Sequence, residues 1–312
     1  MKKILNLLLI LGIVFIGNTQ EKDDDSKIQT SNIQEYTPSK LLKKGQWDVK
    51  FFNSIYTQTK STDEGSKSVT IDRQTFFTNT TEIYTGVSKN ARINIGLILQ
   101  VRSNTFGGAG VFDVFKFKDN NTDARSGLTT IAPSIRVQPF KNIGNFSFTS
   151  SFYIPVFSDK PNAPYLDKQS YFWETKFFYD KTFGGDKWQI FTEIDFGFNF
   201  GEKRKDANPL TENISERFAN NSLFMPISAF LSYFPSDNTT VFINLQQTYL
   251  IGYDNPDSGD NNFSQNGTAF GFGGKLQLNE TLNLEASYGK IFRGHNFQGL
   301  GNTYSVGLRA LF

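Results

Sequence analysis

From Gln46 to its end, this chain consists largely of short segments in which apolar and polar residues alternate one by one. In residues 91–103, the aliphatic side chains from Ile93 to Val101 occupy one face of an extended chain, and Arg92, Arg102 and several amides occupy the other. Adjacent side chains of a strand point to opposite faces, so each such segment has one apolar and one polar face. The pattern predicts β-strands rather than helices.

About twelve segments of this kind can be counted, each near the roughly 9–11 residues that a tilted strand needs to cross a bilayer. The expected strand centres are Ile55, Thr81, Leu97, Ala132, Ser150, Thr175, Ile194, Ser228, Leu245, Phe272, Ala286 and Leu308. Short connections alternate with long ones; the short ones are expected at 88–90, 139–145, 184–187, 236–238 and 279–281. The sequence therefore predicts an all-β, antiparallel transmembrane β-barrel of about 12 strands, with short periplasmic turns and long extracellular loops.

A soluble secreted β protein such as a jelly roll is the alternative, because its strands also alternate. The mean hydropathy of −0.38 is that of a soluble protein, yet the chain contains 33 Phe residues. A membrane barrel explains how a low mean hydropathy and many Phe residues occur together, because every second residue faces lipid and the others face water. Aromatic residues near the strand ends, Trp47 and Trp188 among them, also favour the membrane.

The first residues have the pattern of an export signal. Lys2 and Lys3 precede the apolar run 4–16, which is too short to span a bilayer as a helix. We expect residues 1–19 to be a signal peptide, 20–44 a flexible periplasmic segment and 45–312 the barrel. Without Lys2 and Lys3, the 32 basic residues become 30 and equal the 30 acidic ones. This balance argues against a nucleic-acid partner and predicts location in the outer membrane of a Gram-negative bacterium.

Most catalytic and cofactor chemistry is excluded by composition. There is no cysteine, and His295 is the single histidine, so thiolate sites and histidine metal sites cannot form within one chain. His295 lies in an expected loop without the nearby serine of outer-membrane phospholipases, which makes a lipid hydrolase the weakest of the functions considered. Asp254, Asp257 and Asp260 form a candidate calcium site in a loop, although a solvated loop is the favoured explanation. We expect no cofactor and no structural metal.

The polar strand faces carry charges of both signs toward the expected lumen. The candidate lumen-lining residues are Arg92, Arg102, Arg136, Glu174, Lys176, Glu193, Asp195, Lys275, Glu285 and Arg309. A pore selective for acidic solutes would carry a track of one sign, so the mixture predicts passive passage of small, uncharged or modestly apolar solutes. A non-conducting subunit of a larger envelope complex remains the alternative. Outer-membrane lipid and either a solute or an envelope protein are the expected partners.

One long loop, residues 105–115, is rich in aromatic residues. Phe106, Phe112 and Phe115 are candidates for a constriction that folds into the lumen, or for a contact surface with a partner. The sequence does not choose between these two roles, and it does not give an oligomeric state.

The end of the chain, residues 304–312, resembles the C-terminal assembly signal of bacterial outer-membrane barrels, an alternating strand closed by an aromatic residue, here Phe312. The Phe-rich and Asn-rich composition and the Leu-Leu-Lys-Lys-Gly-Gln-Trp stretch at 41–47 resemble outer-membrane proteins of the Bacteroidota. The layout, with Ile-Ala-Pro-Ser-Ile-Arg at 131–136, is similar to the outer-membrane transporter family named for the phenol-degradation meta pathway. This resemblance implies an outer-membrane transporter.

Overall fold

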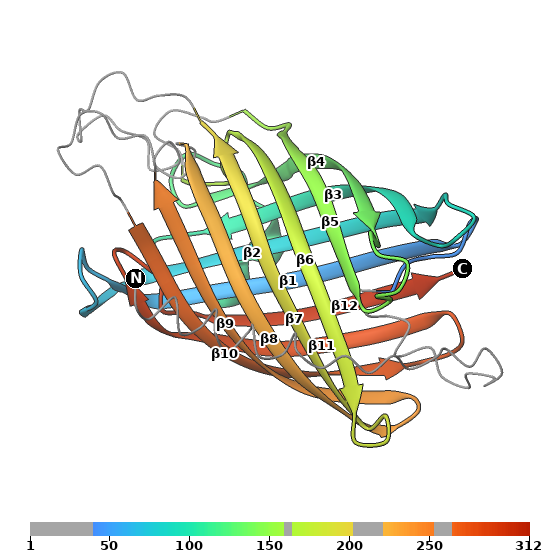
Figure 1. Cartoon of the computed structure of the whole chain (residues 1–312). Helices are drawn as coiled ribbons and strands as arrows, with labels where there is room; N and C mark the ends of the chain where they lie inside the picture. The colour runs from blue at the N-terminus through green and yellow to red at the C-terminus, as the bar shows by residue number, and fades with distance from the viewer. Residues whose placement is uncertain (1–39, 159–163, 202–220, 253–263) are drawn as a thin grey trace. The chain divides into compact units, whose positions relative to one another are not determined.

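A computed structural model of the chain describes residues 40–158, 164–201, 221–252 and 264–312. These residues form twelve strands closed into one antiparallel barrel (Figure 1). The strands are β1 (Trp47–Thr62), β2 (Ser68–Gly86), β3 (Ile93–Thr105), β4 (Ala124–Val137), β5 (Phe146–Pro155), β6 (Tyr171–Phe183), β7 (Trp188–Phe200), β8 (Ser222–Ser236), β9 (Thr239–Gly252), β10 (Ser264–Gln277), β11 (Leu282–His295) and β12 (Asn302–Leu311). Within the described residues, no helix has the length and apolar character needed to cross a membrane.

Each strand pairs with its neighbour in sequence, and β1 pairs with β12 to close the barrel. The closing register runs from Asp48 opposite Leu311 to Thr57 opposite Asn302. Every expected strand centre falls inside one of the twelve strands, so the predicted count and order are confirmed. Several strands are longer than expected, and β2 reaches 19 residues because its hairpin with β1 continues beyond the length that crosses a bilayer.

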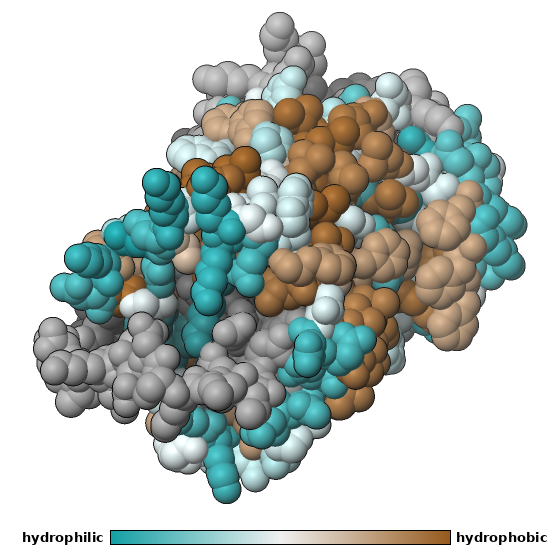
Figure 2. Space-filling model, turned by 90° about the vertical axis from the view of Figure 1, so that its right-hand side faces the viewer, coloured by the Kyte–Doolittle hydropathy of each residue, from teal (hydrophilic) through white to brown (hydrophobic). Residues whose placement is uncertain are grey.

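The two faces of the wall have the polarity that alternation predicts. Outward side chains such as Ile95, Leu97 and Val306 are exposed, and hydrophobic residues form a band between hydrophilic regions in Figure 2. Among the described residues, 30 polar or charged residues are buried, against 12 hydrophobic ones. A soluble β-sandwich buries its apolar face instead, so the soluble alternative is wrong.

The connections define two ends of the barrel, which we call the turn end and the loop end. Five short turns and the last residue, Phe312, lie at the turn end, which faces the periplasm in outer-membrane barrels. There the backbones of Trp47 and Phe312 exchange two hydrogen bonds, of 3.0 and 2.9 Å. Just before β1, the side chain of Leu42 is buried, and the backbone of Lys44 forms an isolated parallel β-bridge with Gly86. The last residues of the expected flexible segment therefore pack against the barrel. The expected signal peptide lies outside the described residues.

The connection between β3 and β4 contains a short 3₁₀ helix, η2 (Val111–Lys116), which packs against the outer wall. The hydroxyl of Ser103 donates to the carbonyl of Val114 (2.6 Å), and the ring of Phe115 lies 5.4 Å from that of Phe77. Phe77 pairs with Ile55 and faces outward. Phe115 therefore does not line a constriction, and Phe112 is 72% exposed. Of the three expected constriction residues, only Phe106 contacts an inward side chain, that of Phe76.

Candidate functional site

The inner wall near the turn end holds a cluster of five charged side chains, here called the turn-end cluster: Asp48, Lys50, Glu82, Arg136 and Arg309. Arg309 donates to both carboxylate oxygens of Asp48, at 2.7 and 2.8 Å. Arg136 bridges Asp48 (3.1 Å) and Glu82 (2.8 Å), and Lys50 donates to Glu82 (3.1 Å). The strand registers bring these residues together, since Lys50 stands opposite both Glu82 on β2 and Arg309 on β12.

An aromatic ring supports the cluster from the wall. The guanidinium carbon of Arg136 lies 3.4 Å from the centroid of the Tyr84 ring, which is a cation–π contact. The Tyr84 hydroxyl donates to Ser134 (2.7 Å), which fixes the ring. Gly96 stands opposite Tyr84, and a Cβ there would lie 2.3 Å from the ring, so the glycine makes room for it.

A second cluster, here called the mid-wall cluster, surrounds Lys176 on β6. The Lys176 ammonium lies 3.3 Å from Asp195, 3.5 Å from Glu174 and 3.6 Å from Glu193. The Tyr153 hydroxyl donates to Glu174 (3.0 Å). One cation among three carboxylates gives a formal charge of −2, whereas three cations and two carboxylates give the turn-end cluster +1. The two clusters thus carry formal charges of opposite sign on different parts of the inner wall.

A cavity of about 240 Å³ lies inside the barrel. Its walls contain four phenyl rings, five charged groups and several smaller polar or glycine positions; the lining residues are Lys50, Phe52, Gln189, Phe191, Glu193, Phe230, Ser232, Phe242, Lys275, Asn283, Glu285, Gly307 and Arg309. Lys275 and Glu285 form an ion pair of 3.2 Å across the β10–β11 register. The cavity can therefore contact an apolar ring while the charged groups around it are largely satisfied by one another.

Residues 165–168, in the connection between β5 and β6, lie inside the lumen at its loop end. The Asn104 side chain donates to the carbonyls of Tyr165 (2.9 Å) and Leu166 (2.8 Å), and Leu166 is only 1% exposed. Asp167 forms an ion pair of 2.9 Å with Arg102. These contacts narrow the lumen with the β5–β6 connection, whereas the candidate constriction considered from the sequence was in the β3–β4 connection.

Lys168 follows in the same connection and lies among aromatic rings. Its ammonium is 5.2 Å from the centroid of Phe172 and 5.4 Å from that of Phe224, and it donates to Asn199 (3.5 Å). Burial lowers the pKa of Lys168 to about 8. The group is therefore a cation whose charge changes near neutral pH.

Nine of the ten expected lumen-lining residues lie on the inner wall: Arg102, Arg136, Glu174, Lys176, Glu193, Asp195, Lys275, Glu285 and Arg309. Arg92 differs, because it lies in the turn before β3 and donates to the Gln138 carbonyl (3.0 Å). Asp167 and Lys168 were not expected in the lumen, since period-two alternation gives no information about a loop.

The structure gives His295 a neighbour that the sequence did not predict. The hydroxyl of Ser66 lies 3.1 Å from Nδ1 of His295 at the loop end. Among the residues that the structure describes, no carboxylate contacts the imidazole, so the third group that orients a catalytic histidine is missing there. Among the described residues, no three His, Cys, Asp or Glu side chains are arranged so that they could hold one metal ion, and Asp254, Asp257 and Asp260 lie outside the described residues.

A closed antiparallel barrel with an apolar outer wall and a polar, charged lumen defines this chain as an outer-membrane β-barrel protein of a Gram-negative bacterium. Its structure is similar to that of an outer membrane channel from Pseudomonas putida F1, with a TM-score of 0.67 and 13% identity over 88% of this chain and 98% of the other. It is also similar to the β domain of the Bordetella autotransporter BrkA, with a TM-score of 0.56 and 12% identity over 86% and 99% of the two chains. No protein-family model and no curated protein sequence matches the chain. At these identities the likeness concerns the fold.

Proposed function

We propose that the barrel is a passive channel for small solutes that are uncharged or modestly apolar. The observation that carries this proposal is the luminal cavity of about 240 Å³ with the rings of Phe52, Phe191, Phe230 and Phe242 in its wall. An apolar cavity of about 150 Å³ holds benzene, so this one has room for a single ring with polar substituents. The Pseudomonas putida protein of the same fold is described as a channel, which supports the same role here.

The charges support a preference for neutral solutes. Lys50, Lys275 and Arg309 each have a carboxylate within 3.2 Å, so an anionic solute would have to compete with an existing ion pair. The same holds for a cationic solute at Glu285, whose partner is Lys275. A neutral solute meets no such competition and gains contact with the phenyl rings.

The test is transport by the purified protein in proteoliposomes, with glucose, phenyl glucoside and glucuronate as solutes of increasing aromatic or anionic character. We expect phenyl glucoside and glucose to enter and glucuronate to enter several-fold more slowly. Phe242→Ala removes a ring from the cavity and should raise the rate for glucose while reducing the preference for phenyl glucoside. Phe196→Ala removes an exposed ring from the outer wall and is the matched control.

The alternative is a non-conducting barrel that serves as a subunit of an envelope complex. The observation that favours it is the loop end, where residues 165–168 and the Arg102–Asp167 pair occupy the lumen. No uptake of any of the three solutes, together with no conductance in planar bilayers, would contradict the channel and favour the subunit.

A further inference from the structure

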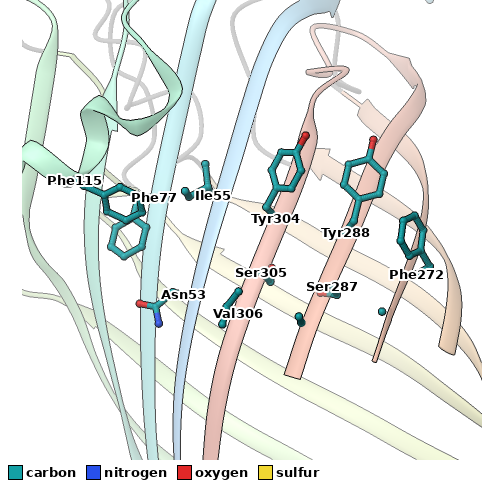
Figure 3. A pocket seen from close by; sticks show the side chains of 12 residues that line it. Asn53, Ile55, Phe77, Phe115, Phe272, Ser287, Tyr288, Tyr304, Ser305 and Val306 are labelled. Atoms are coloured by element: carbon teal, nitrogen blue, oxygen red, sulfur yellow. The ribbon is translucent and has the colours of Figure 1, made fainter. Parts of the chain in front are cut away.

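The outer wall carries a groove of about 410 Å³, separate from the lumen. It lies over β1, β2 and β10 to β12, and its outward side chains include Ile55, Phe77, Phe272, Tyr288 and Val306 (Figure 3). All of these side chains stand on the lipid-facing side of the strand registers. The groove has the size of a small-molecule site, for which roughly 300–1,000 Å³ is usual.

One end of the groove is bounded by η2. Phe115 of η2 lines the groove and packs edge-on against Phe77, which is only 5% exposed although it faces outward. Phe117 packs against the same ring at 5.9 Å. A helix turn held on the outer wall thus converts an ordinary strand surface into a bounded groove.

The outer wall beside this groove carries some polar side chains. Toward the loop end, Thr57 and Thr75 face outward, share a hydrogen bond of 3.1 Å and are buried. Toward the turn end, Asn53 and Asn79 face outward and share a hydrogen bond of 3.0 Å, whereas Phe51 is exposed and apolar. These polar groups bond to one another within the wall, so the lining of the groove stays mainly apolar.

Two tyrosines and a lysine stand on the other side of the groove. Tyr288 on β11 and Tyr304 on β12 are cross-strand partners with ring centroids 5.3 Å apart, and the Tyr288 hydroxyl donates to Asn302 at the loop end (2.8 Å). Tyrosines are enriched at the membrane–water interface, which places this end of the groove near the outer-leaflet headgroups. Lys290 is the next outward residue of β11 and is exposed. Among the described residues it has no acidic partner. Across the groove, the end of η2 adds the exposed Lys116, which contacts Asp113 (2.7 Å).

We propose that the groove is a binding site for one phosphorylated lipid of the outer leaflet, with an acyl chain in the groove and its phosphate at Lys290. The apolar lining faces the bilayer, so an acyl chain is the apolar group that reaches it. A lysine just above an apolar surface supplies the charge complementarity that an anionic headgroup requires. This site is independent of whether the lumen conducts.

The test is native mass spectrometry of the full-length protein in mild detergent, titrated with diphosphorylated lipid A and, separately, with a phosphate-free diacylglycerol. We expect one lipid A molecule to bind per barrel and the diacylglycerol to bind more weakly. Lys290→Gln should weaken lipid A binding about fivefold, the effect of one basic residue near an anionic lipid surface. Ala286→Trp fills the groove floor and should abolish binding of both lipids.

Matched variants separate the groove from the rest of the wall. Ala229→Trp adds the same bulk to an exposed outward alanine on β8, and Lys141→Gln removes an exposed lysine at the turn end. Both should bind lipid A as the wild type does. Lipid A binding that is unchanged in Ala286→Trp would overturn the proposal. So would a barrel dimer that disappears in Ala286→Trp, because a second copy would then occupy the groove.

Discussion

Neutralising Asp48 should destabilise the barrel more than neutralising any exposed carboxylate in the lumen. The Asp48 side chain is completely buried and accepts hydrogen bonds from Arg309 at 2.7 and 2.8 Å and from Arg136 at 3.1 Å. Asp48→Asn keeps the size of the side chain but removes the charge that both guanidinium groups face. Arg136 retains Glu82 at 2.8 Å, whereas Arg309 loses both of these charge-assisted contacts. Breaking a buried pair in this way costs about 3–5 kcal/mol of unfolding free energy.

Because Asp48 lies on β1 and Arg309 on β12, the hydrogen bonds that are lost join the two strands that close the barrel. The measurement is urea unfolding of the protein in lipid vesicles, followed by tryptophan fluorescence. Glu285→Gln is the matched control, since its pair with Lys275 (3.2 Å) has both side chains about 30% exposed and is worth at most about 1 kcal/mol. Equal loss of unfolding free energy in the two variants would refute the argument that burial makes the Asp48 contacts strong.

Three further predictions concern the loop end, pH and assembly. Asn104→Ala removes two hydrogen bonds that hold residues 165–168 in the lumen, about 2 kcal/mol together, and should raise single-channel conductance; unchanged conductance would mean that this segment does not narrow the path. With its pKa lowered to about 8, Lys168 loses its charge as pH rises from 7 to 9, so the reversal potential in a salt gradient should shift toward cation preference. Lys168→Met should abolish that pH dependence, and an identical shift in the variant would exclude Lys168 as its source. Phe312→Ala should lower the amount of barrel recovered from the outer membrane several-fold, whereas Phe312→Tyr should not; equal recovery of both variants would contradict the assembly role.

The outer wall shows how far period-two alternation reaches. Ile93, Ile95 and Leu97 were expected to share the apolar face, and they face outward, because the side-chain period of a strand is fixed by the backbone. The lumen residues Arg136, Lys176 and Arg309 follow from the same rule. Arg92 departs from it because β3 begins one residue later and the turn captures its side chain.

The β3–β4 connection shows where this reasoning stops. Its aromatic content was compatible with a luminal constriction or with an outer contact surface, and Phe115 is held outside by Phe77 and by the Ser103 hydrogen bond to Val114. The lumen is instead narrowed by residues 165–168, whose sequence contains no periodic signal. Whether a loop turns inward or outward depends on which side chains surround its ends in space. The alternation of residues along the strands does not reveal these neighbours.

The sequence by itself determined the twelve strands, their antiparallel order and the polarity of each face, because all three depend on local periodicity and on connection length. Only the tertiary structure decided which charges become partners. Asp48 and Arg309 are 261 positions apart, and they meet because barrel closure sets the register of β1 on β12. The outer groove also depends on barrel closure, because closure places β1 and β2 beside β10, β11 and β12. The helix turn η2, from the β3–β4 connection, bounds one end of this groove.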